Sequence, residues 1–107
     1  MELEVMERLV LLQILPKEGN LLQLKIARTL REELSFDEQE HVAIGLTEDS
    51  GVIHWDDTKA QSKDVEIGPK AMEMIHKALD ELDKAGKLRA EYLDLCEKLG
   101  YGGADEG

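Results

Sequence analysis

Apolar residues recur at helical spacing from the start of the chain, and they cover more than one face of the first predicted helix, residues 3–15. Pro16 ends this helix, because proline lacks a backbone N–H and restricts the residue before it. A helix that is apolar around so much of its circumference is either central to a core or shared with a second subunit. The second alternative makes Leu9, Val10 and Leu12 a candidate dimer or partner surface.

Two capping boxes predict the starts of two more helices, since each places a side-chain acceptor three residues before Glu or Gln. They are Asn20 with Gln23, and Ser35 with Glu38. The second helix extends to residue 34, and the third extends to residue 42 or 43, before the helix-ending Gly45. The second helix has an apolar stripe at Leu22, Ile26, Leu30 and Leu34. The first part of the chain therefore predicts three helices joined by short turns.

After these helices, the period changes to short apolar segments between turn-forming residues. Residues 46–47 and 52–55 flank a turn-forming segment at 48–51, which predicts a β-hairpin. A polar loop is predicted over residues 56–63, and alternating charged and apolar residues over 64–67 predict a third short strand. We therefore expect a small antiparallel sheet of two or three strands.

The last part of the chain returns to helical spacing. One helix is predicted over residues 69–85, with Pro69 at its tolerated first position, and another over about 89–99, so that the two form a helical hairpin. The expected fold class is α+β: three N-terminal helices, a small sheet in winged-helix-like order, and the C-terminal helical hairpin. Residues 1–100 form a single domain in this interpretation, and the glycine-rich acidic residues 101–107 form a disordered tail.

The chain has 24 acidic and 13 basic residues, which give a net charge of −11. Residues 1–50 contribute −6 and residues 51–107 contribute −5, so the acidity belongs to the folded surface and not to a tail. A phosphate backbone repels such a surface, whereas a basic protein is attracted to it over a long range. Nucleic acid is therefore not an expected ligand, and a basic protein is the expected partner. The alternative is that the acidity only keeps the protein soluble.

A second hypothesis assigns DNA binding to the second helix, because three helices followed by a hairpin is the order of a winged-helix domain. Lys25, Arg28 and Arg31 recur there at i, i+3 and i+6 and form a short basic stripe that would contact DNA. The predicted wing, however, is acidic at Glu48, Asp49, Asp56 and Asp57. The transcriptional regulator is therefore the secondary hypothesis.

Residues with metal-binding or nucleophilic chemistry are present, but their spacing matches no recurring site. His54 and Asp56 are the densest candidate for a metal, which the sequence leaves open. Cys96 lies in an apolar helical stripe, which favours a buried packing thiol over a reactive one. We therefore predict a protein that is not an enzyme and has no cofactor. Trp55 is predicted either to anchor the sheet against the helix at 69–85 or to belong to a binding surface.

The lone cysteine, the acidic N-terminal residues and the short apolar runs predict a cytoplasmic protein outside the membrane.

Three segments of the chain resemble small uncharacterised proteins encoded by tailed bacteriophages and prophages. They are residues 14–20 (ILPKEGN), 30–36 (LREELSF) and 66–68 (EIG), and the likeness spans most of residues 9–99. The resemblance implies a viral or prophage origin and the cytoplasm of a host bacterium, and it supplies no activity and no site residues. By analogy it implies an accessory factor that modulates or inhibits a host protein.

These expectations together favour a non-enzymatic protein–protein interaction module. Monomers rarely expose a large apolar patch, and a twofold dimer is the commonest way to cover one, so we also expect a homodimer. Its candidate surface comprises Leu9, Val10, Leu12 and Trp55.

Overall fold

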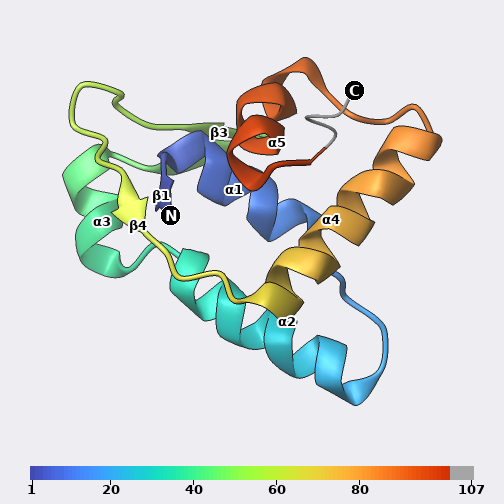
Figure 1. The fold of residues 1–107 in the computed structure, drawn as a ribbon. Helices are drawn as coiled ribbons and strands as arrows, with labels where there is room; N and C mark the ends of the chain where they lie inside the picture. Colours follow the sequence, from blue (N-terminus) through green and yellow to red (C-terminus); the bar gives the residue numbers. More distant parts are fainter. Residues whose placement is uncertain (102–107) are drawn as a thin grey trace.

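Five α-helices and two small antiparallel sheets make up residues 1–101, the part of the chain that the computed structural model describes (Figure 1). The helices are α1 (Val5–Ile14), α2 (Leu21–Leu34), α3 (Glu38–Ile44), α4 (Pro69–Lys84) and α5 (Leu93–Leu99), and a 3-10 turn at Ala90–Tyr92 precedes α5. The strands are β1 (Glu2–Leu3), β2 (Thr47–Asp49), β3 (Val52–His54) and β4 (Lys63–Asp64). The predicted α+β fold with its C-terminal helices is confirmed. The disorder predicted for residues 101–107 concerns positions that, after Tyr101, lie outside the described residues.

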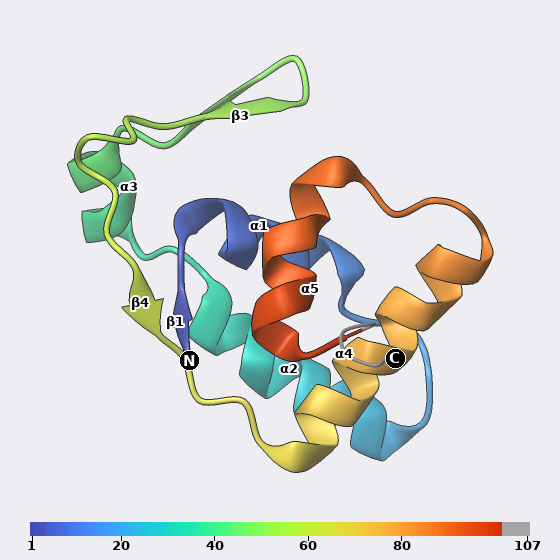
Figure 2. The same cartoon turned by 45° about the horizontal axis from the view of Figure 1, so that its top comes forward.

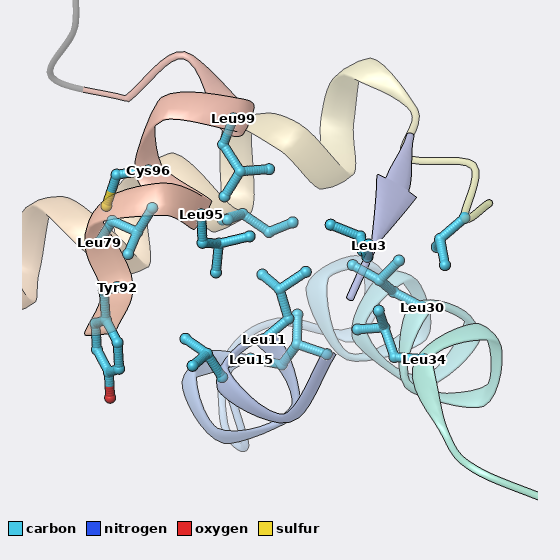
Figure 3. Packing of buried hydrophobic residues seen from close by; sticks show 13 residues of the cluster. Leu3, Leu11, Leu15, Leu30, Leu34, Leu79, Tyr92, Leu95, Cys96 and Leu99 are labelled. Carbon is cyan, nitrogen blue, oxygen red and sulfur yellow. The ribbon is translucent and has the colours of Figure 1, made fainter. Parts of the chain in front are cut away.

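α1 lies at the centre of the core, where it packs against both α2 and α4. Buried leucines from five elements gather around it (Figure 3): Leu3, Leu11, Leu15, Leu30, Leu34, Leu79, Leu95 and Leu99. Full burial of one such side chain contributes about 1.5–3 kcal/mol of transfer free energy. The apolar circumference of α1 is therefore explained by a central position in the core, the first of the two alternatives that its sequence left open.

The third strand predicted for the sheet belongs to a separate sheet. β4 pairs with β1, with Leu3 opposite Lys63, and β1 occupies the predicted start of the first helix. The N-terminal amine donates a hydrogen bond to Asp64 Oδ1 at 2.7 Å, and the N–H of Val65 donates to the carbonyl of Met1 at 2.8 Å. These bonds and the full burial of Leu3 hold the first residues extended, so α1 begins two residues later than predicted.

β2 and β3 form the predicted hairpin, with Thr47 opposite His54. Its turn places Ser50 at φ 53° and Gly51 at φ 82°, the left-handed conformations that a type I′ turn requires at both central positions. The hairpin projects away from the helices as a two-stranded ribbon (Figure 2). Such a ribbon is at most marginally stable alone.

The start of α3 corrects the prediction that Ser35 caps this helix. Asp37 is the N-cap, and its carboxylate accepts a hydrogen bond from the N–H of Glu40 at 2.8 Å. Ser35 instead ends α2, where its hydroxyl donates to the carbonyl of Arg31 at 2.7 Å. The chain stays extended after α2, because Arg8 binds the backbone carbonyls of Leu34 and Ser35 at this point.

A buried arginine fastens α1 to the end of α2 and to α3. Arg8 Nε donates to the carbonyl of Leu34 at 3.1 Å, and Nη2 donates to the carbonyl of Ser35 at 2.7 Å. The guanidinium also pairs with Glu40 at 2.7 Å and lies 3.9 Å from the ring centroid of Phe36. A guanidinium tolerates burial when its donors are matched in this way. We call these five residues the arginine joint.

α5 packs back onto α4 and closes the core. His76 Nε2 lies 2.7 Å from the carbonyl oxygen of Leu99, and the hydroxyl of Tyr101 lies 3.3 Å from Asp80 and 3.2 Å from Asp83. Desolvation and the hydrogen bond to Asp83 raise the pKa of Tyr101 to about 12, so its hydroxyl remains a donor at neutral pH. None of the helices in residues 1–101 is long and apolar enough to span a membrane.

Candidate protein-binding furrow

The two ends of α2 differ in burial. Its C-terminal half supplies Leu30 and Leu34 to the core, whereas Leu21 and Leu22 in its first turn are 69% and 56% exposed. Asn20 begins the helix immediately before them, since its side chain accepts a hydrogen bond from the N–H three residues later at 2.9 Å. Monomeric proteins rarely leave a contiguous apolar patch in water without a use. The exposed first turn of α2 is therefore the starting point for a candidate site.

A hollow of about 450 Å³ lies between the exposed face of α2 and the first turn of α4. The apolar residues that line it are Leu22, Ile26, Leu30, Pro69 and Ala71. Its charged residues are Lys25, Glu33, Glu66 and Lys70. Ligand-binding hollows have volumes of about 300–1,000 Å³, and most are apolar with a few polar groups that fix orientation.

Two more hollows continue the first along α4. The second, about 340 Å³, shares Leu22 and Ile26 with the first, and the third, about 150 Å³, shares Met74 and Lys77 with the second. The three follow the seam between α2 and α4 over residues 68–81 of the latter, which is about 20 Å along a helix axis. Figure 1 shows the two helices diverging from the start of α4 toward its end. We call this elongated surface the α2–α4 furrow.

Charged side chains form an ordered pattern along the furrow. From the start of α4 to its end they are Glu33 with Glu66, Lys25 with Lys70, Glu73 with Lys77, and Glu18 with Glu81. Within residues 1–101, neither Lys25 nor Lys70 has a carboxylate oxygen within 4.0 Å of its ammonium nitrogen. The first turn of α4 adds positive partial charge near Lys70, because its N-cap, Gly68, has no side chain to satisfy the first N–H groups. The furrow is therefore acidic at both ends, and between them it carries Lys25, Lys70 and Lys77 against the single acid Glu73.

The partner surface predicted on the first helix is largely used by the core. Val10 is 2% exposed and belongs to the core cluster, and Leu12 packs against that cluster. Leu9 is half-buried and lines a hollow of about 250 Å³ together with Trp55. Val10 is therefore unavailable to a partner in this fold, because α1 is surrounded by other elements.

Trp55 lies between the hairpin and α1. It lines hollows with Met6 and Leu9, and its indole N–H donates to Asp57 at 2.7 Å. The neighbouring walls come from α1, the hairpin and the segment before α5. No residue of α4 lines these hollows, so they add no support to the expected anchoring of Trp55 against α4.

Lys25, Arg28 and Arg31 do not form one surface. Residues at i, i+3 and i+6 are spread over about 120° of a helix. Lys25 lines the furrow, whereas Arg31 donates to the carbonyl of Pro16 at 3.4 Å. The hairpin, which would serve as the wing, lies on the opposite side of the molecule from α2 (Figures 1 and 2). This arrangement adds no support to the DNA-binding hypothesis.

The residues considered for other chemistry lie apart from the furrow. Among the described residues, no three His, Cys, Asp or Glu side chains converge as a metal site requires. His54 is exposed, and the hydroxyl and N–H of Thr58 donate to Asp56 and lower the pKa of this carboxyl. Cys96 is buried, as predicted, and burial raises the pKa of its thiol.

Comparison with protein-family models, with curated proteins and with solved structures finds no match to the chain. The candidate site therefore rests on the geometry and lining of the α2–α4 furrow alone. Sequence reasoning missed it, because Leu22 and Ile26 lie in the same apolar stripe as Leu30 and Leu34, and the stripe does not distinguish exposed members from buried ones. The available signal was the density of apolar residues at positions 21, 22, 24 and 26, which is more than one helix face can bury.

Proposed function

We propose that this protein is a non-enzymatic interaction module that binds a partner protein through the α2–α4 furrow. The observation that carries the proposal is an apolar hollow, extended along α4 by two further, more polar hollows and bordered by charges, on a helix whose other end is fixed in the core. A partner that covers the furrow removes Leu22 and its apolar neighbours from water, which is how the centre of an interface gains its affinity. The charges around the floor then set the orientation of the partner.

The net charge of −11 supports a partner with basic residues. Attraction between opposite charges accelerates association and weakens as salt is added. The resemblance to phage-encoded proteins extends the proposal: the partner is a protein of the host bacterium, met in its cytoplasm, and binding modulates or inhibits it.

The proposal is tested by capture of partners from bacterial lysate with three forms of the protein: wild type, Leu22→Glu and Val42→Glu. Val42 lies on α3, is 79% exposed and lines none of the three furrow hollows, so the two variants make the same change in charge at exposed positions. We expect wild type and Val42→Glu to retain a common protein that Leu22→Glu binds about tenfold less, with retention falling at high salt. Equal capture by all three forms would contradict the proposal.

A homodimer is a second candidate, favoured by Leu21 and Leu24, which add further exposed apolar side chains to the first half of α2. Light scattering over a range of protein concentrations measures the mass directly. A dimer that Leu22→Glu dissociates and Val42→Glu preserves would assign the furrow to a second copy of the chain. A monomer at every concentration would reject this candidate.

A further inference from the structure

The proposed function does not say which structure of the partner occupies the furrow. The length, lining and charges of the furrow indicate what kind of segment fits it. Its three hollows are continuous over about 20 Å, which matches an α-helix of about 13 residues. Its first hollow is lined mainly by apolar side chains from two helices, and the other two combine Met74 and Ala78 with polar residues, as in grooves that accept one face of an amphipathic helix. A compact ligand would fill one hollow and leave the others in water.

The charge pattern defines the polar groups of the occupant. Lys25 on α2 and Lys70 on α4 both line the first hollow, and both lack a carboxylate partner within residues 1–101. A carboxylate on the occupant is therefore the complementary group at this position. At the two ends the furrow presents pairs of carboxylates, from Glu33 with Glu66 and from Glu18 with Glu81, which would meet basic side chains.

We propose that the α2–α4 furrow binds an amphipathic helix of a partner protein that carries a carboxylate opposite Lys25 and Lys70 and a basic residue near each end. This inference rests on the proposed function. The net charge of the chain is consistent with it, because two basic residues and one acidic residue give the helix a positive charge that the acidic surface attracts. The carboxylate lies nearer the end at Glu66 than the end at Glu81, since Lys70 lines the same hollow as Glu66 and is about 16 Å from Glu81 along the axis of α4.

Two synthetic peptides of equal composition test the pattern. Each is a helix of about 16 residues with leucines at i, i+4, i+7 and i+11. The first has a lysine near each end and a glutamate between them, and in the second the glutamate has exchanged places with one lysine. Because their net charge is the same, general attraction to the acidic protein cannot distinguish them. Fluorescence anisotropy is expected to show that the first peptide binds about tenfold more tightly.

Charge reversal in the protein gives the complementary measurement. In the double variant Lys25→Glu and Lys70→Glu, the preference should reverse, because the central lysine of the second peptide now meets two carboxylates. Lys59→Glu with Lys87→Glu is the matched control, since it makes the same change in net charge at exposed lysines outside the furrow and should keep the wild-type preference. Circular dichroism verifies that each variant is folded.

The possible outcomes separate this inference from the proposed function. Equal binding of both peptides, or a preference that Lys25→Glu with Lys70→Glu leaves unchanged, overturns the charge pattern while the furrow remains a binding surface. Binding of neither peptide overturns the helical occupant. Failure of the proposed function has a different signature, namely lysate capture that is insensitive to Leu22→Glu.

Discussion

The two ends of α2 have similar leucine content but differ in burial: the leucines at the C-terminal end are buried, and those in the first turn are exposed. At the C-terminal end, the backbone carbonyls of Leu34 and Ser35 accept hydrogen bonds from Arg8, and Leu34 is completely buried. At the N-terminal end, Leu21 and Leu22 are mostly exposed, and the neighbouring helix α4 diverges from α2 (Figure 1). One end of the helix is therefore part of the fold, and the other is available for contact.

The difference shows that the elements packed against an apolar residue decide whether it is buried. Its position in a helical stripe does not decide this. α1 has the denser apolar pattern, yet most of its apolar side chains belong to the core or pack against it, whereas α2 keeps Leu21 and Leu22 in its first turn exposed. Changes at the arginine joint should therefore affect the stability of the fold, and changes in the furrow should affect binding. The predictions below test this division.

Arg8→Ala is expected to have the largest effect. The substitution leaves two backbone carbonyls without their donor, removes the partner of the half-buried Glu40 and leaves a cavity at a fully buried side chain, and we expect these losses together to destabilise by about 3 kcal/mol. Urea denaturation of the wild type and the variant measures this difference in free energy of unfolding.

Arg8→Lys is the control for the geometry of the joint. Lysine keeps the charge but lacks the planar fork that reaches two carbonyls and a carboxylate together, so its free energy of unfolding should lie between wild type and Arg8→Ala. A loss below about 1 kcal/mol in Arg8→Ala would show that the joint does not hold α1, α2 and α3 together.

A pair of equal truncations compares the core with the furrow. Leu11→Ala removes a completely buried side chain and should destabilise by about 3 kcal/mol, within the range for large-to-small changes in cores. Leu22→Ala makes the same chemical change in the furrow and should alter stability by less than about 0.5 kcal/mol. Thermal unfolding measures both, and similar losses in the two variants would show that Leu22 is a core residue after all.

The same comparison explains how much the sequence could predict. Helical spacing, capping residues and turn composition are local signals, and they located the helices and the hairpin, with errors of a few residues at the starts of α1 and α3. The β1–β4 pair escaped prediction because it joins two-residue strands from distant parts of the chain, and no periodicity can develop over two residues. The furrow could not be predicted from the sequence, because the exposure of Leu22 depends on how far α4 diverges from α2. That divergence is a property of the packing of the two helices.

The capping residue of α3 is a local signal that was assigned to Ser35 instead of Asp37, and substitutions at these two residues test the assignment. Asp37→Ala removes the acceptor for the N–H of Glu40 and should destabilise by about 1 kcal/mol, the usual effect of losing an N-cap. Ser35→Ala should have a smaller effect, because the Ser35 hydroxyl donates to a carbonyl in an exposed position at the end of α2. Urea denaturation of both variants measures the difference, and the reverse order would restore Ser35 as the cap.

The smallest expected effect is a dependence on acid that comes from Glu40. The hydrogen bond from Arg8 lowers the pKa of this carboxyl below its ordinary value of 4.5, although desolvation opposes the shift. A carboxyl with a lower pKa in the folded state stabilises the protein above its unfolded-state pKa, and this contribution is lost as pH falls through the folded-state value. Glu40→Gln should therefore be less stable than wild type at about pH 7, and the difference should shrink below about pH 4.5.

Urea denaturation across this range measures the dependence, with Glu38→Gln as the control. Glu38 lies in the same first turn of α3, is exposed and takes no part in the arginine joint, so its substitution should not reproduce the acid-dependent difference. If Glu40→Gln and wild type differ equally at all pH values, the charge of Glu40 does not contribute to the joint. The Phe36 contact and the two carbonyl hydrogen bonds of Arg8 would then account for its stability.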